Sequence, residues 1–406
     1  MTNDEIPMTK EMGSPKRGLS HVWASPFRTS FVLGYFVIRH SSFSPGQRRR
    51  GTLTYTGGRL LKVLVTGATG FVGQHLCRRL AELGHRVFAA DCIAGPARTF
   101  PGCEYRACDV CEFTALRAAL RWARPDWIFH LAAISSPPEA ARHPDETWRT
   151  NFLGTVHLYE AVRLSKRKPR ILFVGSSDEY GAPPQERLPI DETCPLSPTG
   201  VYGSSKAAAD LASAFFVERH GLDIVRVRPF NHTGPGQSPR FVCSDFARQV
   251  AEAARRPLRK RTMLVGNLDA RRDFTDVRDI VRAYVLALER CPKGEVYNIA
   301  SGKAVRVGDI LEKLIALADA KIEVRLDPKR LRPSDAPRIV GDASKFRRAT
   351  GVFAHRPTGT AGRNAGLAGL PVRKNSGWRP GIPLDDTLRD LLEYWRAQLK
   401  AENTHQ

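Results

Sequence analysis

The feature that most constrains the fold of this 406-residue chain is a short apolar run followed by three evenly spaced glycines. Residues 61–65 are mainly apolar, and Gly67, Gly70 and Gly73 follow at intervals of three. A continuously apolar strand is typical of a parallel sheet covered by helices on both faces. Glycines between such a strand and a helix allow a tight turn, close approach of a phosphate, and close helix–strand packing. The pattern therefore predicts a strand–turn–helix unit that binds a dinucleotide.

Strands and helices are predicted to alternate over the next 150 residues, because short apolar runs alternate with segments of helical periodicity. This alternation predicts an α/β fold with a doubly wound parallel sheet and right-handed crossovers. We expect a first domain over residues 61–228, followed by a smaller α+β substrate-binding region over residues 229–400. Elements up to residue 300 are expected to interleave partly with the first domain. The predicted strands are 86–90, 127–131, 171–175 and 223–227, and the predicted helices are 74–83, 113–123, 147–165 and 204–220.

Two segments lie outside this pattern. Residues 1–60 have no clear periodicity, and we expect a disordered extension there. Residues 352–377 are rich in glycine, alanine and arginine and contain no acid, which predicts a flexible insert. We therefore place the chemistry of the chain in the patterned residues between and around these segments.

The chain carries a formal net charge of +22. A basic surplus without a recognition motif gives little support for nucleic-acid binding, and we predict none. No run reaches the roughly 18 apolar residues of a membrane-spanning helix, so we predict no membrane association. The eight cysteines lack paired metal-ligand spacing, which predicts no metal site and reduced thiols in a cytoplasmic protein.

The predicted cofactor is NAD or NADP. Asp91 ends the second strand, where an acid binds the adenosine ribose hydroxyls and favours NAD, whereas Arg98 is the nearest cation for the 2′-phosphate of NADP. The choice between the two stays open. Asp109 is expected near the adenine, and the small residues that end the fourth strand are expected beside the nicotinamide. The predicted cofactor-binding residues are Gly67, Thr69, Gly70, Phe71, Val72, Gly73, Asp91, Asp109, Val110, Leu131, Ala132, Ala133, Tyr202, Lys206 and Pro229.

Tyr202 and Lys206 form the second motif. Their spacing of four residues places both side chains on one face of a helix. A phenol normally ionises near pH 10, and a neighbouring ammonium is expected to lower its pKa. We predict that Tyr202 exchanges a proton with a substrate oxygen while a hydride moves to or from the nicotinamide.

The third motif follows the strand that ends at residue 175. Ser176 and Ser177 are both candidates to bind the reacting carbonyl: counting from the strand favours Ser177, and counting back from Tyr180 favours Ser176. Asp178 and Glu179 are either acid–base groups or ordinary loop acids. The residues alone leave both choices open.

These motifs, residues 66–73, the serine pair and residues 202–206, resemble the extended short-chain dehydrogenase/reductase family. The resemblance covers residues 61–351 and resumes at Trp378. It implies a Rossmann fold, a homodimer formed through two helices per subunit, and a nucleotide-sugar substrate. The helices at 147–165 and 204–220 are the candidates for that interface.

Within this family, residues 228–237, 241–242, 245–249, 272–279 and 331–335 are similar to the GDP-6-deoxy-D-mannose reductases. That resemblance implies reduction of the C4 ketone of GDP-4-keto-6-deoxy-D-mannose to GDP-D-rhamnose, with NADPH or NADH as hydride donor. The amide of Asn231 and the planar guanidinium groups of Arg272 and Arg332 are suited to diphosphate oxygens. The predicted substrate-binding residues are Ser177, Asp178, Asn231, Arg272, Arg332, Pro333, Ser334 and Asp335.

Three alternatives remain. A GDP-mannose 4,6-dehydratase would need an acid and a base to eliminate water, which Asp178 and Glu179 could provide, and a 4-epimerase would share the same motifs. A basic cofactor-sensing or RNA-associated protein without catalysis belongs to another class, and it would need neither Tyr202 nor Lys206.

Overall fold

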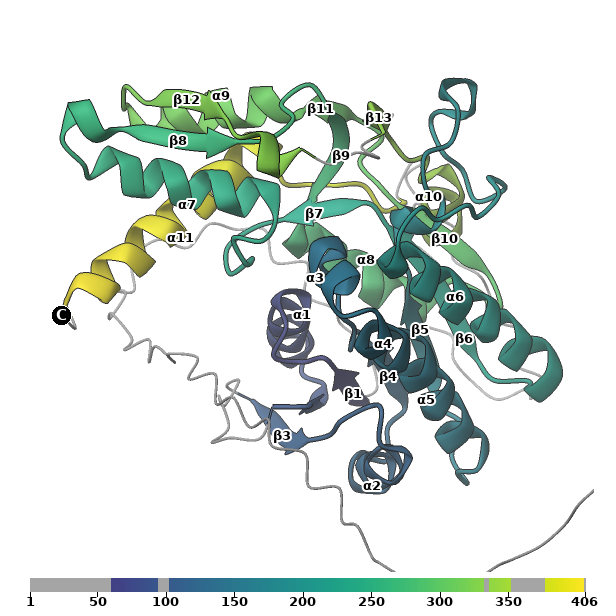
Figure 1. Cartoon of the computed structure of the whole chain (residues 1–406). Helices are drawn as coiled ribbons and strands as arrows, with labels where there is room; N and C mark the ends of the chain where they lie inside the picture. The colour runs from purple at the N-terminus through teal and green to yellow at the C-terminus, as the bar shows by residue number, and fades with distance from the viewer. Residues whose placement is uncertain (1–59, 94–101, 332–335, 352–376, 405–406) are drawn as a thin grey trace, which may run out of the picture. The chain divides into compact units, whose positions relative to one another are not determined.

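The computed structural model describes residues 60–93, 102–331, 336–351 and 377–404 (Figure 1). The predicted disordered extension, apart from residue 60, and the predicted insert, apart from residue 377, lie outside the described residues.

The first layer of the fold is a parallel sheet of seven strands in the order β10-β6-β5-β4-β1-β2-β3. The strand order reverses between β1 and β4, and ligands bind at the carboxyl ends of strands beside such a switch point. The predicted doubly wound α/β fold is confirmed. The strands are β1 (Lys62–Thr66), β2 (Arg86–Asp91), β3 (Cys103–Ala107), β4 (Trp127–His130), β5 (Arg170–Val174), β6 (Ile224–Pro229) and β10 (Val296–Ile299).

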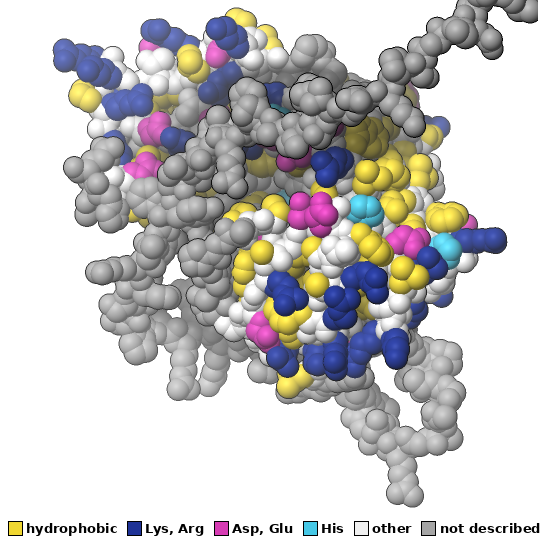
Figure 2. All heavy atoms as spheres, turned by 60° about the horizontal axis from the view of Figure 1, so that its bottom comes forward, with side chains coloured by type: hydrophobic (Ala, Val, Ile, Leu, Met, Phe, Trp, Pro, Cys, Tyr) yellow, Lys and Arg dark blue, Asp and Glu magenta, His cyan; other side chains and the backbone are white. Residues whose placement is uncertain are grey.

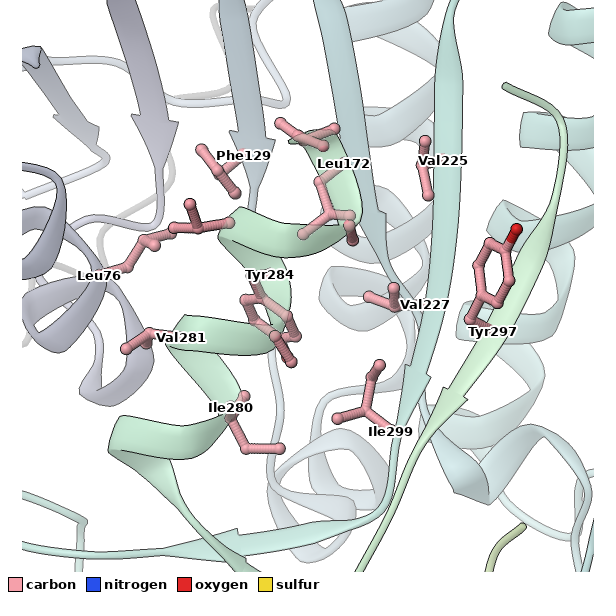
Figure 3. Close-up of a cluster of buried hydrophobic side chains, with 14 of the residues drawn as sticks. Leu76, Phe129, Leu172, Val225, Val227, Ile280, Val281, Tyr284, Tyr297 and Ile299 are labelled. Carbon is pink, nitrogen blue, oxygen red and sulfur yellow. The ribbon is translucent and has the colours of Figure 1, made fainter. Parts of the chain in front are cut away.

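Helices cover both faces of this sheet, and successive strand residues alternate between the two cores. Val63 and Val65 of β1 join the core beneath α1 (Phe71–Glu82) and α8 (Val277–Arg290). Leu64 between them joins the core beneath α2 (Phe113–Ala123), α5 (Gly154–Arg163) and α6 (Val201–His220). Figure 3 shows the first of these cores, where Tyr284 of α8 lies among side chains from the strands. This covering on both faces explains the continuously apolar strands.

The predicted helix over residues 147–165 differs from the structure. The chain forms α3 (Pro137–Arg142), α4 (Pro144–Thr147), a π-helical segment η1 (Trp148–Leu153) and then α5. Asn151 in η1 is fully buried, and its side chain accepts a hydrogen bond from the Ile134 amide at 2.8 Å and donates to the Ile134 carbonyl at 3.1 Å. Residue periodicity does not reveal such a local change in helical winding.

The second region carries two small sheets and its own hydrophobic core, lined by α7, α9 and α11. The chain returns to the first sheet through α8 and β10, so residues 277–299 belong structurally with the first layer. The division at residue 228 stays a prediction. The elements of this region are β7 (Asn231–Thr233), α7 (Val242–Ala254), β8 (Thr262–Val265), β9 (Arg271–Asp276), β11 (Ala304–Arg306), α9 (Val307–Ala318), β12 (Glu323–Leu326), β13 (Arg338–Ile339), α10 (Ser344–Gly351) and α11 (Leu384–Thr404); the short helices η2 (Ser177–Glu179), η3 (Gln185–Arg187), η4 (Leu258–Lys260) and η5 (Pro328–Arg330) lie in loops.

The surface is mixed in character. Figure 2 shows Lys and Arg side chains gathered in the lower part of the face that it draws, interspersed with hydrophobic and acidic side chains. Among the described residues, no helix is long and apolar enough to cross a membrane. All eight cysteines are free thiols, and no group of His, Cys, Asp or Glu in the described part of the chain could hold a metal ion.

Candidate active site

One large cavity, of about 1390 Å³, lies at the carboxyl ends of the central strands. A pocket for one small ligand has roughly 300–1,000 Å³, so this cavity has room for two ligands. Every predicted site residue that the structure describes lines it, on the cofactor side and on the substrate side alike. Arg98 and four predicted substrate residues lie outside the described residues: Arg332, Pro333, Ser334 and Asp335.

The turn between β1 and α1 accepts only glycine at two of its three positions. Gly67 has a φ of +69°, and a Cβ there would lie 2.7 Å from the backbone nitrogen of Ala132. A Cβ on Gly73 would lie 2.3 Å from the Gly67 carbonyl oxygen, so α1 packs directly on the turn. Helix α1 begins at Phe71, and the residues of its first turn line the cavity. Such a turn fits a pyrophosphate, which the positive end of the helix dipole attracts.

Asp91 stands at the end of β2 with its carboxylate fixed toward the same turn. Its Oδ2 accepts hydrogen bonds from the Thr69 amide at 2.9 Å and the Thr69 hydroxyl at 2.7 Å. Its Oδ1 accepts one from the Cys92 amide at 2.8 Å. The acid is therefore held where the ribose hydroxyls of a dinucleotide would lie. Its link to Thr69 depends on the tertiary fold and is not apparent from the sequence spacing.

Asp109 follows β3, and His130 is the last residue of β4. These two strands flank β1 and β2 in the sheet. Asp109 lines the cavity, and its Oδ1 accepts a hydrogen bond from the Cys111 amide at 2.8 Å. His130 is buried and hydrogen-bonds to Thr66 and Thr155 through its two ring nitrogens. Burial, and secondarily the charge of Lys206, lower its pKa to about 3, so His130 is neutral and structural.

Tyr202 lies in the first turn of α6, and its side chain lines the cavity. The predicted lowering of its pKa by Lys206 is wrong: burial raises the pKa of the phenol, and the charge of Asp178 raises it further. A hydrogen bond with the Ser176 side chain acts in the opposite direction. The phenol is therefore protonated at neutral pH. This contact also favours Ser176 over Ser177 as the serine that acts with Tyr202.

Lys206 is buried one turn further along α6 and lines the same cavity. Its ammonium lies 4.9 Å from the centroid of the Phe173 ring. Burial lowers its pKa to about 8, and the carboxylates of Glu179 and Asp210 oppose that change. The pKa of the ammonium is therefore set by burial and by two buried acids, and burial of the phenol outweighs any lowering of the Tyr202 pKa by Lys206.

The two acids after the serine pair have different positions. Asp178 is exposed and lines the cavity, whereas Glu179 is fully buried and does not line it. An acid–base role in contact with substrate is therefore open to Asp178 and closed to Glu179. Ser177, buried in η2, also lines the cavity.

The second region supplies the other wall of the cavity. Asn231 of β7 and Arg272 of β9 both line it, as predicted from the sequence. Sequence reasoning missed further cations that line the same cavity. Two of these are held by acids: Arg240 lies 2.6 Å from Glu139, and Arg330 lies 2.6 Å from Asp245. The family resemblance covered the segments that contain these cations. Because the chain holds many arginines, the sequence alone did not show which of them line the cavity. The missed cations are Arg149, Arg240, Lys329 and Arg330.

Comparison with known proteins identifies the family. The family model described as GDP-mannose 4,6 dehydratase matches residues 64–355. The chain belongs to this family. The chain is also similar to the GDP-6-deoxy-D-mannose reductase of Pseudomonas aeruginosa, to which it is 31% identical over 342 residues, covering 84% of this chain and 99% of the relative. The predicted membership of the extended short-chain dehydrogenase/reductases is thereby confirmed.

Two further comparisons, one with a solved structure and one with a sequence relative, also cover most of the chain. A solved structure of RMD from Pseudomonas aeruginosa, complexed with NADPH, superimposes with a TM-score of 0.67 at 30% identity and covers 83% of this chain and 99% of that one. The UDP-glucose 4-epimerase of Streptomyces lividans is 29% identical over 302 residues, covering 71% of this chain and 90% of the relative. The chain is therefore similar in sequence both to a reductase and to an epimerase.

Proposed function

We propose that this protein reduces the C4 ketone of GDP-4-keto-6-deoxy-D-mannose to GDP-D-rhamnose, with NADPH or NADH as the hydride donor. One observation carries the proposal: Tyr202 and Ser176 line the same cavity as the glycine turn of α1. The match to a GDP-6-deoxy-D-mannose reductase over nearly its whole length supports the choice of substrate.

The residues on the cofactor side fit a dinucleotide. The turn at Gly67 and Gly73 leaves no room for side chains, and Asp91 offers acceptors to ribose hydroxyls. The bound NADPH or NADH supplies the hydride that reduces the ketone carbon. Asn231 and Arg272, from the opposite wall, would hold the diphosphate of the sugar nucleotide.

The protein's own residues then manage the proton. Ser176 would hold the ketone oxygen beside Tyr202, and the phenol, protonated at neutral pH, donates its proton to that oxygen as the alcohol forms. The positive charge of Lys206, one turn further along α6, would favour the phenolate that remains, whereas burial opposes it. A general acid that starts protonated is what a reduction requires.

The decisive experiment supplies purified protein with GDP-4-keto-6-deoxy-D-mannose and either NADPH or NADH. The expected product is heavier by two hydrogens, and its sugar is identified by NMR. No product with either cofactor would contradict the proposal.

A dehydratase is the second candidate, and Asp178 is the observation that favours it, because this acid lines the cavity beside Tyr202. Incubation with GDP-mannose and no added cofactor separates the two. Loss of water without net oxidation would identify a dehydratase, whereas a 4-epimerase would change the configuration at constant mass. For a basic RNA-associated protein, gel-shift binding that survives physiological salt would be expected.

We further propose a homodimer formed through the helices on one face of the first layer. Large apolar side chains are exposed on η1, on α6 and directly after the end of α5; α5 and α6 lie side by side in Figure 1. Leu211 and Phe215 of α6 are 63% and 54% exposed, and Leu153 in η1 is 42% exposed. Exposed apolar patches of this kind mark interaction surfaces. Sedimentation velocity would give the oligomeric state.

A further inference from the structure

The buried Glu179 is the feature that the reaction above does not use. Its side chain is fully buried although it lies one residue from the exposed Asp178. Its Oε1 accepts a hydrogen bond from the backbone amide of Ser176 at 2.7 Å. The Ser176 hydroxyl in turn accepts one from the Asp178 amide at 3.1 Å. These reciprocal bonds fix both the backbone and the side chain of Ser176.

The backbone makes room for this acid. A Cβ on Gly175 would lie 2.3 Å from the Glu179 Oε1 and 3.1 Å from the Val227 carbonyl oxygen. Residue 175 must therefore be glycine for Glu179 to turn inward. Gly175 and Glu179 together form one structural unit behind Ser176.

Glu179 also belongs to a buried group of charges. Arg228 Nε lies 3.0 Å from the Glu179 Oε2 and 3.0 Å from the Asp210 Oδ2. Asp210 is fully buried and also pairs with Arg226 at 2.5 Å. Lys206 responds to both acids. A buried charge without a partner is strongly unfavourable, so removing one member changes the charge state of the others.

The facing groups divide into those that favour and those that oppose charge on Glu179. Burial is the largest effect and raises its pKa, and Asp210 acts in the same direction. Arg228, the Ser176 amide and Lys206 lower the pKa of Glu179 and so favour the charged carboxylate. Tyr202 and Tyr180 respond to the charge of Glu179 in turn. Glu179 and Lys206 therefore titrate as a linked pair with Asp210 and Arg228.

We propose that Glu179 is a positioning residue for the reaction: its carboxylate, held against Arg228, fixes Ser176 through the backbone amide and places a negative charge behind the catalytic serine and lysine. Glu179 acts through these residues and does not contact the cavity. The kinetic consequence rests on the proposed function, whereas the effect on Lys206 does not.

The test uses Glu179→Gln, which retains the shape and an acceptor for the Ser176 amide but removes the charge. Glu186→Gln, on the exposed surface of η3, is the matched control. The first readout is the extent of Lys206 acetylation by acetic anhydride against pH, measured by peptide mass spectrometry. We expect the midpoint to fall by about one to three pH units in Glu179→Gln, because one opposite charge near Lys206 is lost. The control should match the wild type.

The second readout is the pH profile of kcat for ketone reduction. We expect its alkaline limb to move in the same direction as the acetylation midpoint, with the KM for the cofactor unchanged. If the wild-type protein does not reduce the ketone, the proposed function fails while acetylation still tests Glu179. Equal acetylation midpoints in Glu179→Gln and the wild type would overturn the inference.

Gly175→Ala provides an independent variant that keeps the carboxylate. Its Cβ would displace Glu179, so we expect the Lys206 midpoint to move as in Glu179→Gln. In a Glu179→Ala background, Gly175→Ala should change the midpoint of Lys206 acetylation little further, because the carboxylate that it would displace is already gone. Equal shifts in both backgrounds would contradict the proposed link between Gly175, Glu179 and Lys206.

Discussion

The fixed carboxylate of Asp91 makes a specific prediction about the cofactor. Three hydrogen bonds, two from Thr69 and one from the Cys92 amide, prevent it from turning away from the ribose position. NADP carries a phosphate where NAD carries a ribose hydroxyl, so NADP would place a second negative charge beside this acid. We therefore expect the wild-type protein to use NADH better than NADPH, although a relative of similar fold is complexed with NADPH.

The size of the preference follows from electrostatics. Two unit charges about 5 Å apart interact by about 1 kcal/mol in water and about 3 kcal/mol at an effective dielectric constant of 20. Asp91 is half-buried, which places it between these limits. Because about 1.4 kcal/mol corresponds to tenfold, the expected preference for NADH is about 5-fold to 150-fold in kcat/KM.

Asp91→Asn tests this reasoning directly. The amide oxygen can keep both bonds from Thr69, and the substitution gives up mainly the charge and the bond from Cys92. We expect the ratio of kcat/KM for NADH and NADPH, measured from absorbance at 340 nm, to fall toward one. Asp109→Asn, at the end of the next strand, should change both cofactors alike. A wild-type preference for NADPH, or an unchanged ratio in Asp91→Asn, would refute the argument.

Four further outcomes follow. Tyr202→Phe should lower kcat by about 10²–10⁴-fold, with cofactor binding by fluorescence unchanged. Because the lowered pKa of Lys206 is about 8, kcat for reduction should fall as the pH rises through that value, in a stopped-flow or steady-state profile. His130 has a folded pKa of about 3 against an unfolded value near 6.5, so its contribution to stability is complete above pH 6.5 and is lost as the pH falls. His130→Gln should therefore lower the free energy of unfolding by about 1–3 kcal/mol at neutral pH, measured by denaturant unfolding. The stability of this variant should also depend less on pH between about 6.5 and 3 than that of the wild type. Phe215→Glu should give monomers in sedimentation velocity without changing the circular dichroism spectrum.

The elements that the sequence predicts best are those set by local spacing. The glycine turn, helix α2 and the pair of Tyr202 and Lys206 on one face of α6 each follow from a few neighbouring residues. Strands that helices cover on both faces can also be predicted, because their central residues are mainly apolar. The position of Asp91 at the end of β2 follows from the same pattern.

The parts that were not predictable depend on contacts between distant segments. The choice between Ser176 and Ser177 turns on which hydroxyl meets Tyr202, 26 positions along the chain, and counting along the strand gave two answers. In the sequence, Glu179 looks like an exposed loop acid beside Asp178. Its burial is explained by its contact with Arg228 and by the lack of a side chain at Gly175, where the carboxylate lies. The periodicity of apolar residues predicts neither the choice of serine nor the burial of Glu179.

The wrong expectation about Tyr202 shows which physical quantity the sequence omits. Spacing of four residues does bring Tyr202 and Lys206 to one face of α6, but a pKa depends on everything around the group, including the loss of water. In this structure the enclosure of the phenol outweighs any nearby cation, and the ammonium is balanced by Glu179 and Asp210. A phenol that keeps its proton until the ketone oxygen gains charge is suited to reduction, whereas the reverse oxidation would first have to remove that proton. The same burial that contradicts the expected pKa therefore favours the direction of reaction that we propose.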